Sequence, residues 1–324
     1  MTRRGSVLLY VVWVVILLSL FSAGVAGQAM FALDLSERLA GQMRAIQVAR
    51  GALQYAQLSL ERDESASVDD LSEMWSNDPG RFRERALGEG VFTLTDGGDG
   101  RHTRYGMADE ERRLPLNTAT APVLARLCER VGGLRPDQAA QVADAIVDWR
   151  DEDDERQPHG AEDFDYRGRT LYESKDAPFQ NVEELLLVDG MTVELYQRLL
   201  PHVTVHGSGA VNLNTAGPEV LAALGLTTLG VDGMELYRAG GDAVEGTSDD
   251  QRLTAIAAME SELAAYVPPE ELVRLVPARE AELLGVGSTA FRFRVAAEAG
   301  GSQTRMSAEA IIGRDGALHA WSVR

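Results

Sequence analysis

Residues 5–27 read GSVLLYVVWVVILLSLFSAGVAG and follow the basic start MTRR. The first charged side chain after the two arginines is Asp34, so an apolar run of about twenty residues extends from Val7 to about Ala26. As a helix, this run spans roughly the 30 Å hydrocarbon thickness of a bilayer. Because cytoplasmic flanks of membrane helices are rich in arginine and lysine, we expect a cytoplasmic N-terminus and a chain body on the opposite side.

The same stretch has a second interpretation as a secretory signal peptide. The small residues of SAGVAGQA could serve as a cleavage site, although a signal normally has a shorter apolar region of about 7–15 residues.

Beyond the apolar run, apolar residues recur at helical spacing, at Leu35, Leu39, Met43, Ile46 and Leu53. The pattern predicts one helix from about Ser6 to Arg62, apolar all round in its first half and amphipathic in its second. That second half needs a folded domain to lie against.

Length and charge limit the classes of function. A chain of 324 residues suggests two or three domains. Fifty acidic residues against 31 basic ones give a formal charge of −19, and Lys175 is the only lysine. Such a surface repels phosphate backbones, which argues against nucleic-acid binding, and it suits divalent cations.

An internal repeat organises the middle of the chain. LPLNTATAPVLARL at 114–127 and VNLNTAGPEVLAAL at 211–224 align without a gap, 97 residues apart. Each predicts a short extended segment, an Asn-Thr cap, and a helix with proline in its first turn. The repeat predicts two related helical subdomains.

The remaining segments complete the expected layout. VFTLT, DGGDG and RHTRYGMAD predict a hairpin, and FRFRVAAEA, QTRMSAEAIIGR and ALHAWSVR predict a C-terminal antiparallel meander. HVTVH predicts a strand that returns to the sheet. VEELLLVDGMTVELYQRL predicts two short helices around a glycine turn, a helix-hairpin-helix pattern. We expect a loop in the glycine-rich 225–247 and a helix in DQRLTAIAAMESELAAYV.

The segment DWRDEDDERQPHGAEDFDY at 148–166 is the candidate site for chemistry. Its two acidic clusters repel one another unless water or a cation intervenes. Oxygen ligands without sulfur in an irregular loop favour Ca²⁺, although the spacing differs from that of an EF-hand. From composition alone, a solvated acidic loop fits equally well.

The N-terminal pattern resembles that of type IV pilin-like proteins. Over essentially the full chain, the sequence is similar to the general secretion pathway protein K family, the large minor pseudopilins of type II secretion. The features that carry this resemblance are the leader, the LNTA repeat, VDWRDEDD, GAEDFDY, VEELLLVDGMT and the meander. The resemblance implies cleavage between Gly5 and Ser6 by a prepilin peptidase, with methylation. Most pilin-like proteins have a glutamate at the fifth mature position, where this chain has Tyr10, and the protein K family lacks that glutamate.

The resemblance also implies an α+β fold, in which a long N-terminal helix packs on a small antiparallel sheet that carries a large all-helical insertion. The insertion would contain two related SAM-like or helix-hairpin-helix-like subdomains. The expected division is 1–5 leader, 6–30 transmembrane helix, 31–111 pilin-like helix and first strands, 112–201 first helical subdomain, 202–210 linking strand, 211–288 second helical subdomain, and 289–324 meander. Calcium is implied in the helical region, and we expect Asp151, Asp153, Glu162 and Asp163 as ligands, with Asp176 as a further candidate.

The function implied is assembly rather than catalysis. The protein would lie in the bacterial inner membrane with its body in the periplasm, and it would start the pseudopilus tip with other minor pseudopilins and the inner-membrane platform. No enzyme signature such as G-x-S-x-G, H-E-x-x-H or a P-loop is present in the sequence. Two other classes stay open: a membrane-anchored, competence-like DNA-binding protein built on the helix-hairpin-helix pattern, and an anchored periplasmic enzyme.

Overall fold

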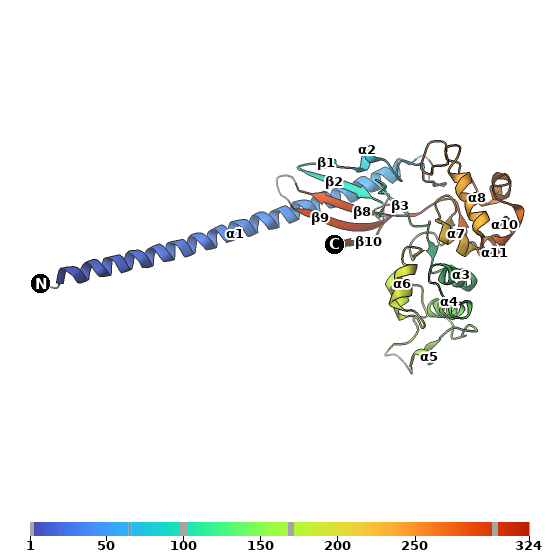
Figure 1. Ribbon diagram of the computed structural model, residues 1–324, viewed down its shortest axis with the longest axis horizontal. Coiled ribbons are helices and arrows are strands. Elements are labelled where there is room, and N and C mark those ends of the chain that lie inside the picture. The colour runs from blue at the N-terminus through green and yellow to red at the C-terminus, as the bar shows by residue number, and fades with distance from the viewer. Residues whose placement is uncertain are drawn as a thin grey trace.

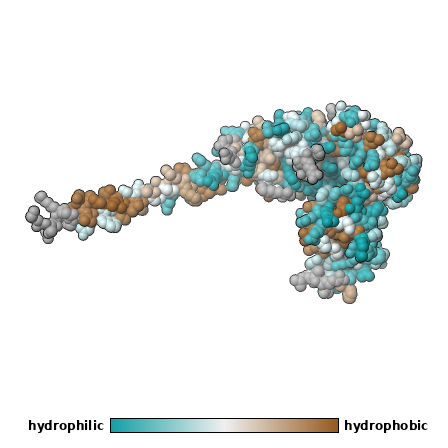
Figure 2. All heavy atoms as spheres, in the orientation of Figure 1, coloured by the Kyte–Doolittle hydropathy of each residue, from teal (hydrophilic) through white to brown (hydrophobic). Residues whose placement is uncertain are grey.

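Helix α1 (Arg3–Glu61) has two halves with different surroundings. The structure is a computed structural model that describes residues 3–63, 65, 67–97, 103–167, 172–299 and 304–323, with the backbone alone at residues 3–6. Residues 7–40 are exposed throughout, and the helix projects far beyond the rest of the molecule (Figures 1 and 2). From Ala45 onward one face is buried against the sheet. The expected continuous helix is confirmed.

The buried face of α1 is narrow because it is built largely from alanine. Ala45, Ala49, Ala52 and Ala56 are each fully buried, at helical spacing. Small side chains let the helix backbone approach the sheet closely, and the large side chains of the sheet fill the space on either side. The members of this core on the sheet are Phe92, Leu94, Phe291, Phe293, Val295, Ala297, Ala310 and Ile312.

The sheet is antiparallel, with strand order β1-β2-β8-β9-β10, and β3 also pairs with β8. Its strands are β1 (Arg85–Leu87), β2 (Gly90–Thr95), β3 (Ala108–Asp109), β8 (Ala290–Glu298), β9 (Arg305–Gly313) and β10 (Leu318–Val323). The short helix α2 (Pro79–Phe82) precedes β1. The C-terminal meander is confirmed. The expected pairing of VFTLT with the segment after it is wrong for β3, which pairs with β8 from the far end of the chain. The amide of Asp96 does donate to the carbonyl of Arg104 at 3.2 Å, and residues 98–100 of the expected DGGDG turn lie outside the described residues.

Between β3 and β8 the chain forms a two-part insertion, which lies at the end of the sheet farthest from the N-terminus (Figure 1). The elements of the first part, called repeat 1, are β4 (Leu114–Pro115), α3 (Ala121–Arg130), α4 (Pro136–Arg150), α5 (Asp163–Arg167), η1 (Val182–Leu187), α6 (Val193–Leu199) and β5 (Val203–Thr204). The elements of the second part, called repeat 2, are β6 (Val211–Asn212), α7 (Pro218–Leu224), α8 (Thr228–Arg238), η2 (Ile256–Ala258), α9 (Met259–Glu262), α10 (Pro269–Arg274), α11 (Val276–Glu280) and β7 (Leu284–Gly285).

Each repeat contains an equivalent pair of hydrogen bonds donated by an arginine. Arg150, at the end of α4, donates to the backbone carbonyls of the first and last residues of the LNTA segment 116–119. Arg238, at the end of α8, does the same for the LNTA segment 213–216. The internal duplication therefore extends beyond the aligned sequence to the second helix of each repeat.

The asparagine of each LNTA segment forms a second equivalent pair of hydrogen bonds. Asn117 donates to the carbonyl of Phe179 at 3.0 Å and accepts from its amide at 2.8 Å. Asn214 makes the same pair of bonds with Leu253, at 3.1 and 2.8 Å. Each asparagine therefore holds a distant segment of its own repeat, which is why the motif recurs.

The fold class is confirmed, but the insertion is not all-helical. Strands β4 and β5 form one parallel pair, and β6 and β7 form another. The linking segment 202–210 does not return to the main sheet, because its strand β5 pairs with β4. Each repeat closes on itself in this way.

The loop expected at 225–247 is wrong for residues 228–238, which form helix α8, whereas residues 239–247 consist mainly of turns. Its glycines allow close packing rather than flexibility. A Cβ on Gly233 would lie 2.5 Å from the carbonyl oxygen of Tyr266, and one on Gly230 would lie 2.6 Å from Oε2 of Glu271. The helix expected after residue 250 is reduced to η2 and α9, a three-residue 3₁₀ turn and a four-residue helix.

Three consecutive acidic residues join the insertion to the sheet. Asp109 accepts hydrogen bonds from Asn212 and Thr215 of repeat 2. Glu110 accepts from Thr204 of repeat 1 and pairs with Arg292 on β8. Glu111, also buried, binds the amides at the start of β8. The chain is thus tied where it enters and leaves the insertion.

Candidate metal centre

The acidic segment begins where α4 ends. Asp148 lies in the last turn of α4, and Asp151 caps the helix. Oxygen atoms of Asp148, Asp151 and Glu162 all lie within 4.8 Å of one another. Asp148 is fully buried and Glu162 is 5% exposed, so this group faces the inside of the loop.

Two oxygens of this group, and one of Asp176, whose charge acts on Asp151 and Glu162 but which lies outside the group, lack a hydrogen-bond partner in the described part of the chain. Oδ1 of Asp151, Oε1 of Glu162 and Oδ1 of Asp176 are buried, and none of them has a hydrogen-bond partner among the residues that the structure describes. A buried carboxylate oxygen without a partner costs free energy, and a native fold normally satisfies it. Three such oxygens around one loop make it the candidate cation site.

The carboxylates of this group also have raised pKa values. Burial, together with repulsion from Asp148 and Asp151, raises the pKa of Glu162 to about 7. Burial likewise raises the pKa of Asp148 to about 6, against the hydrogen bond from the Gln157 amide. The pKa of Asp151 is raised by burial and by Asp153. A bound cation would reverse this repulsion and keep the carboxylates ionised.

Two of the expected ligands make other contacts. Oδ1 of Asp153 accepts a 2.9 Å hydrogen bond from the amide of Glu155. Oδ1 of Asp163 accepts from the amide and hydroxyl of Ser174, at 3.0 and 2.7 Å, and its other oxygen pairs with Arg167. Both lie outside the close group formed by Asp148, Asp151 and Glu162.

Asp148 is the acidic residue that sequence reasoning missed. It lies within the quoted acidic segment, but it is part of a helix rather than of the irregular loop. Its spacing of three residues from Asp151 places both on one side of a helix end, which is the signal that could have identified it. A Cβ on Gly160 would collide with its carboxylate, so the loop needs glycine there.

A second acidic group differs from the first because its carboxylates have side-chain donors. Oxygens of Asp63, Asp69 and Glu73 also lie within 4.8 Å of one another. Arg314 donates to Asp63 at 2.8 Å and to Asp69, and the indole of Trp75 donates to Glu73 at 2.7 Å. Each carboxylate of this group therefore has a side-chain donor, although burial still raises the pKa of Glu73 to about 8 and that of Asp69 to about 6.

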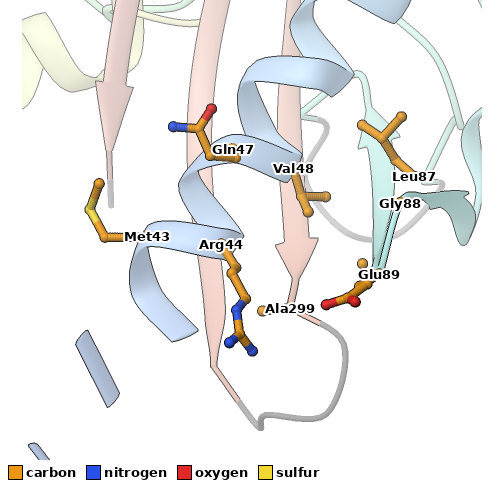
Figure 3. Close-up of a pocket in the computed structure, with 9 residues that line it drawn as sticks. Met43, Arg44, Gln47, Val48, Leu87, Gly88, Glu89 and Ala299 are labelled. Atoms are coloured by element: carbon orange, nitrogen blue, oxygen red, sulfur yellow. The ribbon is translucent and has the colours of Figure 1, made fainter. Parts of the chain in front are cut away.

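A separate groove of about 570 Å³ lies beside the middle of α1. Met43, Arg44 and Val48 of α1, Leu87 and Glu89 of the β1–β2 hairpin, and Ala299 border it. Figure 3 shows that the helix and the hairpin enclose the same space from two sides. Its walls are largely apolar, with one charge of each sign, so it is suited to protein contact rather than to metal binding.

Comparison with known proteins places these features in a family. Residues 103–208 match a family model described as type II secretion system protein K. The chain is 30% identical over 233 residues to type II secretion system protein K of Klebsiella pneumoniae, covering 68% of this chain and 69% of that protein. It is 32% identical over 189 residues to the protein K of Aeromonas hydrophila, covering 56% of this chain and 53% of that one.

A solved structure has the same fold. A chain of the GspK-GspI-GspJ complex from enterotoxigenic Escherichia coli matches with a TM-score of 0.60 and 19% identity, over 91% of this chain and 97% of that one. The DNA-binding alternative is not favoured by these likenesses. Its hairpin, η1 and α6, carries Glu183, Glu184, Asp189 and Glu194.

Proposed function

The chain belongs to the type II secretion system protein K family and is a minor pseudopilin of that system, and we propose that it occupies the tip of the periplasmic pseudopilus. There it would start assembly with other minor pseudopilins and the inner-membrane platform. The observation that carries this proposal is the placement of the insertion. It lies at the end of the sheet remote from the N-terminus of α1 and extends to the side of the helix axis (Figure 1). A subunit so broadened at its far end would obstruct stacking of a further subunit above it.

The first half of α1 supports a membrane-anchored start. Its apolar stretch is long enough to cross a bilayer by length and composition. We propose that the body lies in the periplasm, and that prepilin peptidase cleaves between Gly5 and Ser6, where the backbone of α1 is helical and the new amino terminus would be methylated. Tyr10, exposed on α1, stands where most pilin-like proteins have the glutamate that pairs with the amine of a neighbouring subunit. A tip subunit needs no such pair.

Partner contact is supported by the groove beside α1. Phe31, Leu33, Leu35 and Leu39 are exposed on the stretch between the membrane segment and the sheet. Neither the bilayer nor the sheet covers them, and the groove continues this apolar surface at Met43. We assign this surface to the apolar helix of another minor pseudopilin.

We further propose that the acidic loop of repeat 1 binds calcium. Asp151, Glu162 and Asp176 would supply oxygens together with Asp148. Asp153 and Asp163 would join if they exchanged their present hydrogen bonds. Carboxylates alone, in an irregular loop with carbonyls nearby, match the oxygen-rich and flexible coordination of Ca²⁺. The cation would hold the loop in one shape.

Labelling pseudopili tests the tip assignment. Pseudopili elongated by excess major subunit would be labelled through an epitope inserted in the exposed loop at 241–244. We expect label at one end of each filament, and label along the length would refute the proposal.

The N-terminal residue of membrane-purified protein tests the proposed processing. We expect Ser6 at the N-terminus only when the peptidase is active.

A further inference from the structure

The acidic loop and the helix hairpin of repeat 1 are joined by side chains that directly neighbour the candidate ligands. The hairpin consists of η1 and α6, residues 182–199, with its turn at 188–192. Among the described residues between Asp163 and Asp176, which continue the acidic loop, Tyr166, Tyr172 and Lys175 contact it.

Each of the three bonds ends on a different part of the hairpin. The hydroxyl of Tyr166 accepts from the amide of Asp189 in the turn at 3.0 Å. The hydroxyl of Tyr172 donates to the carbonyl of Leu187 at 3.0 Å. One bond uses a backbone group of the turn and the other uses the last carbonyl of η1, so both hold the backbone of the hairpin rather than a side chain alone.

The third bond is charged. The ammonium of Lys175 donates to Glu184 on η1 at 2.6 Å and to the carbonyl of Pro178 at 2.8 Å. Glu184 in turn accepts from the amide of Asn181 at the start of η1. The only lysine of the chain therefore ties the loop to the first turn of the hairpin.

The same residues are tied to the metal centre. Tyr166 lies on α5, one turn after Glu162, and Lys175 is next to Asp176. Trp149 follows Asp148, and its ring contacts those of Tyr166 and Tyr172 edge-on, at centroid distances of 5.5 and 6.1 Å. Loop positions that would move when the carboxylates separate are thus the positions that hold the hairpin.

From this arrangement we propose that cation occupancy of the acidic loop controls the stability of the helix hairpin at 182–199, through Tyr166, Tyr172 and Lys175. The proposal rests on the calcium site put forward above. Without the cation, repulsion among buried carboxylates opens the loop and withdraws the three contacts. With it, the loop and the hairpin form one cooperative unit.

Hydrogen exchange on the full chain in detergent micelles, with Ca²⁺, with Mg²⁺ or with a chelator, tests the coupling. Calcium binding is measured separately, by calorimetry. For an opening that releases the ion, calcium at 100 times its Kd slows exchange by up to about a hundredfold. We expect slowing of this order in residues 151–162 and at 184–191, and no change in α7 and α8 of repeat 2.

The variant that separates binding from coupling is Tyr166→Phe with Tyr172→Phe. We expect calcium affinity within about threefold of the wild type, retained slowing in the loop, and most of the slowing at 184–191 lost. Tyr237→Phe is the matched control, because it removes a tyrosine bond to a backbone carbonyl, that of Arg252, in repeat 2. It is expected to leave the hairpin response intact.

The outcomes are distinct. Calcium binding with no slowing at the hairpin, or equal slowing in the wild type and the double variant, would overturn the coupling and leave the calcium site standing. Absence of calcium binding by the wild type would overturn both. If the double variant fails to fold, Tyr172→Phe, which leaves no backbone donor without a partner, is compared with the wild type at residues 186–188. Unchanged slowing there would overturn the coupling through Tyr172, and reduced slowing would support it.

Discussion

Repeat 1 and repeat 2 have the same frame but neutralise the acidic residues of their loops differently. In repeat 1 the loop after Arg150 has buried carboxylate oxygens without partners in the described part of the chain. In repeat 2 the loop after Arg238 also contains acidic residues. Oε1 of Glu245 is buried there without a hydrogen bond, but it lies 2.8 Å from a guanidinium nitrogen of Arg238, which balances its charge. Asp249 accepts the amides of residues 241 and 242. The loop of repeat 1 differs because none of its partnerless oxygens, on Asp151, Glu162 and Asp176, forms an ion pair within the described part of the chain.

The two repeats also differ where they join the sheet. Glu110, which binds repeat 1, has its pKa lowered to about 2, since Arg113 and Arg292 outweigh the effect of burial. Asp109, which binds repeat 2, has its pKa raised to about 7 by burial and by Glu111. One joint is an ion pair, and the other is a protonatable group held by neutral donors.

Breaking the shared frame should have the largest effect. Asn214→Ala leaves the amide and carbonyl of buried Leu253 unpaired, and we expect a loss of about 2–4 kcal/mol in the free energy of unfolding. Asn117→Ala, at a half-buried position in repeat 1, should cost about 1–2 kcal/mol. Urea unfolding followed by circular dichroism compares the two. Equal losses would show that the hydrogen bonds of Asn117 and Asn214 contribute equally to stability despite their different burial.

The acidic loops of the two repeats should differ in their response to calcium. At 100 times its Kd, calcium should stabilise the wild type by about 2–3 kcal/mol, and Glu162→Gln should remove most of this gain. Without calcium, the same substitution should raise stability, because it relieves repulsion between buried carboxylates. Thermal unfolding with calcium or a chelator measures both effects. Glu245→Gln in repeat 2 is the control, and a reduced calcium response in that variant would contradict the comparison.

The two joints between the repeats and the sheet should differ in how their contribution to stability depends on pH. The folded pKa of Asp109 lies above its unfolded value of 3.8, so the folded state retains a proton that the unfolded state loses. Its contribution to stability is complete below about pH 4 and is lost as the pH rises through about 7. Asp109→Asn should remove about one proton from the pH dependence of unfolding over this window, measured with saturating calcium. An unchanged slope would refute the assignment.

The smallest effect should come from the contacts between the repeats. Arg130 pairs with Glu219 across α3 and α7, and both side chains are partly exposed. Arg130→Ala should therefore cost at most about 1 kcal/mol. Arg126 donates to the carbonyl of Ala223 at 2.7 Å, and Arg126→Ala should cost about 1–2 kcal/mol. If the urea midpoint fell more in Arg130→Ala than in Arg126→Ala, the surface ion pair would contribute more to the stability of this interface than the hydrogen bond of Arg126.

Sequence reasoning was most accurate where the pattern was periodic. The apolar run and the spaced residues after it predicted α1 almost to its ends, and alternation predicted β8, β9 and β10. It failed where glycine had a packing role. Gly230 and Gly233 suggested a loop, but they allow α8 to approach its neighbours.

The candidate site was recoverable in part. Asp151 and Glu162 were named from the acidic run and Asp176 from the family resemblance, and each has a buried oxygen without a hydrogen-bond partner among the described residues. Asp148 was not named, because its contribution depends on the return of the loop through Gly160 to the end of α4. Asp153 and Asp163 have the same side chain as the others, and only their hydrogen bonds distinguish them.

By itself, the sequence determined the long helix, its apolar first half, the meander and the duplication, because each depends on local spacing or on similarity between segments. The tertiary structure decided the partners: which strand pairs with β3, what Asn117 and Asn214 hold, and which acidic residues meet arginine. These choices depend on contacts between residues far apart in the chain. Whether a buried carboxylate is neutralised depends on the groups that surround it, and the order of residues does not contain that information locally.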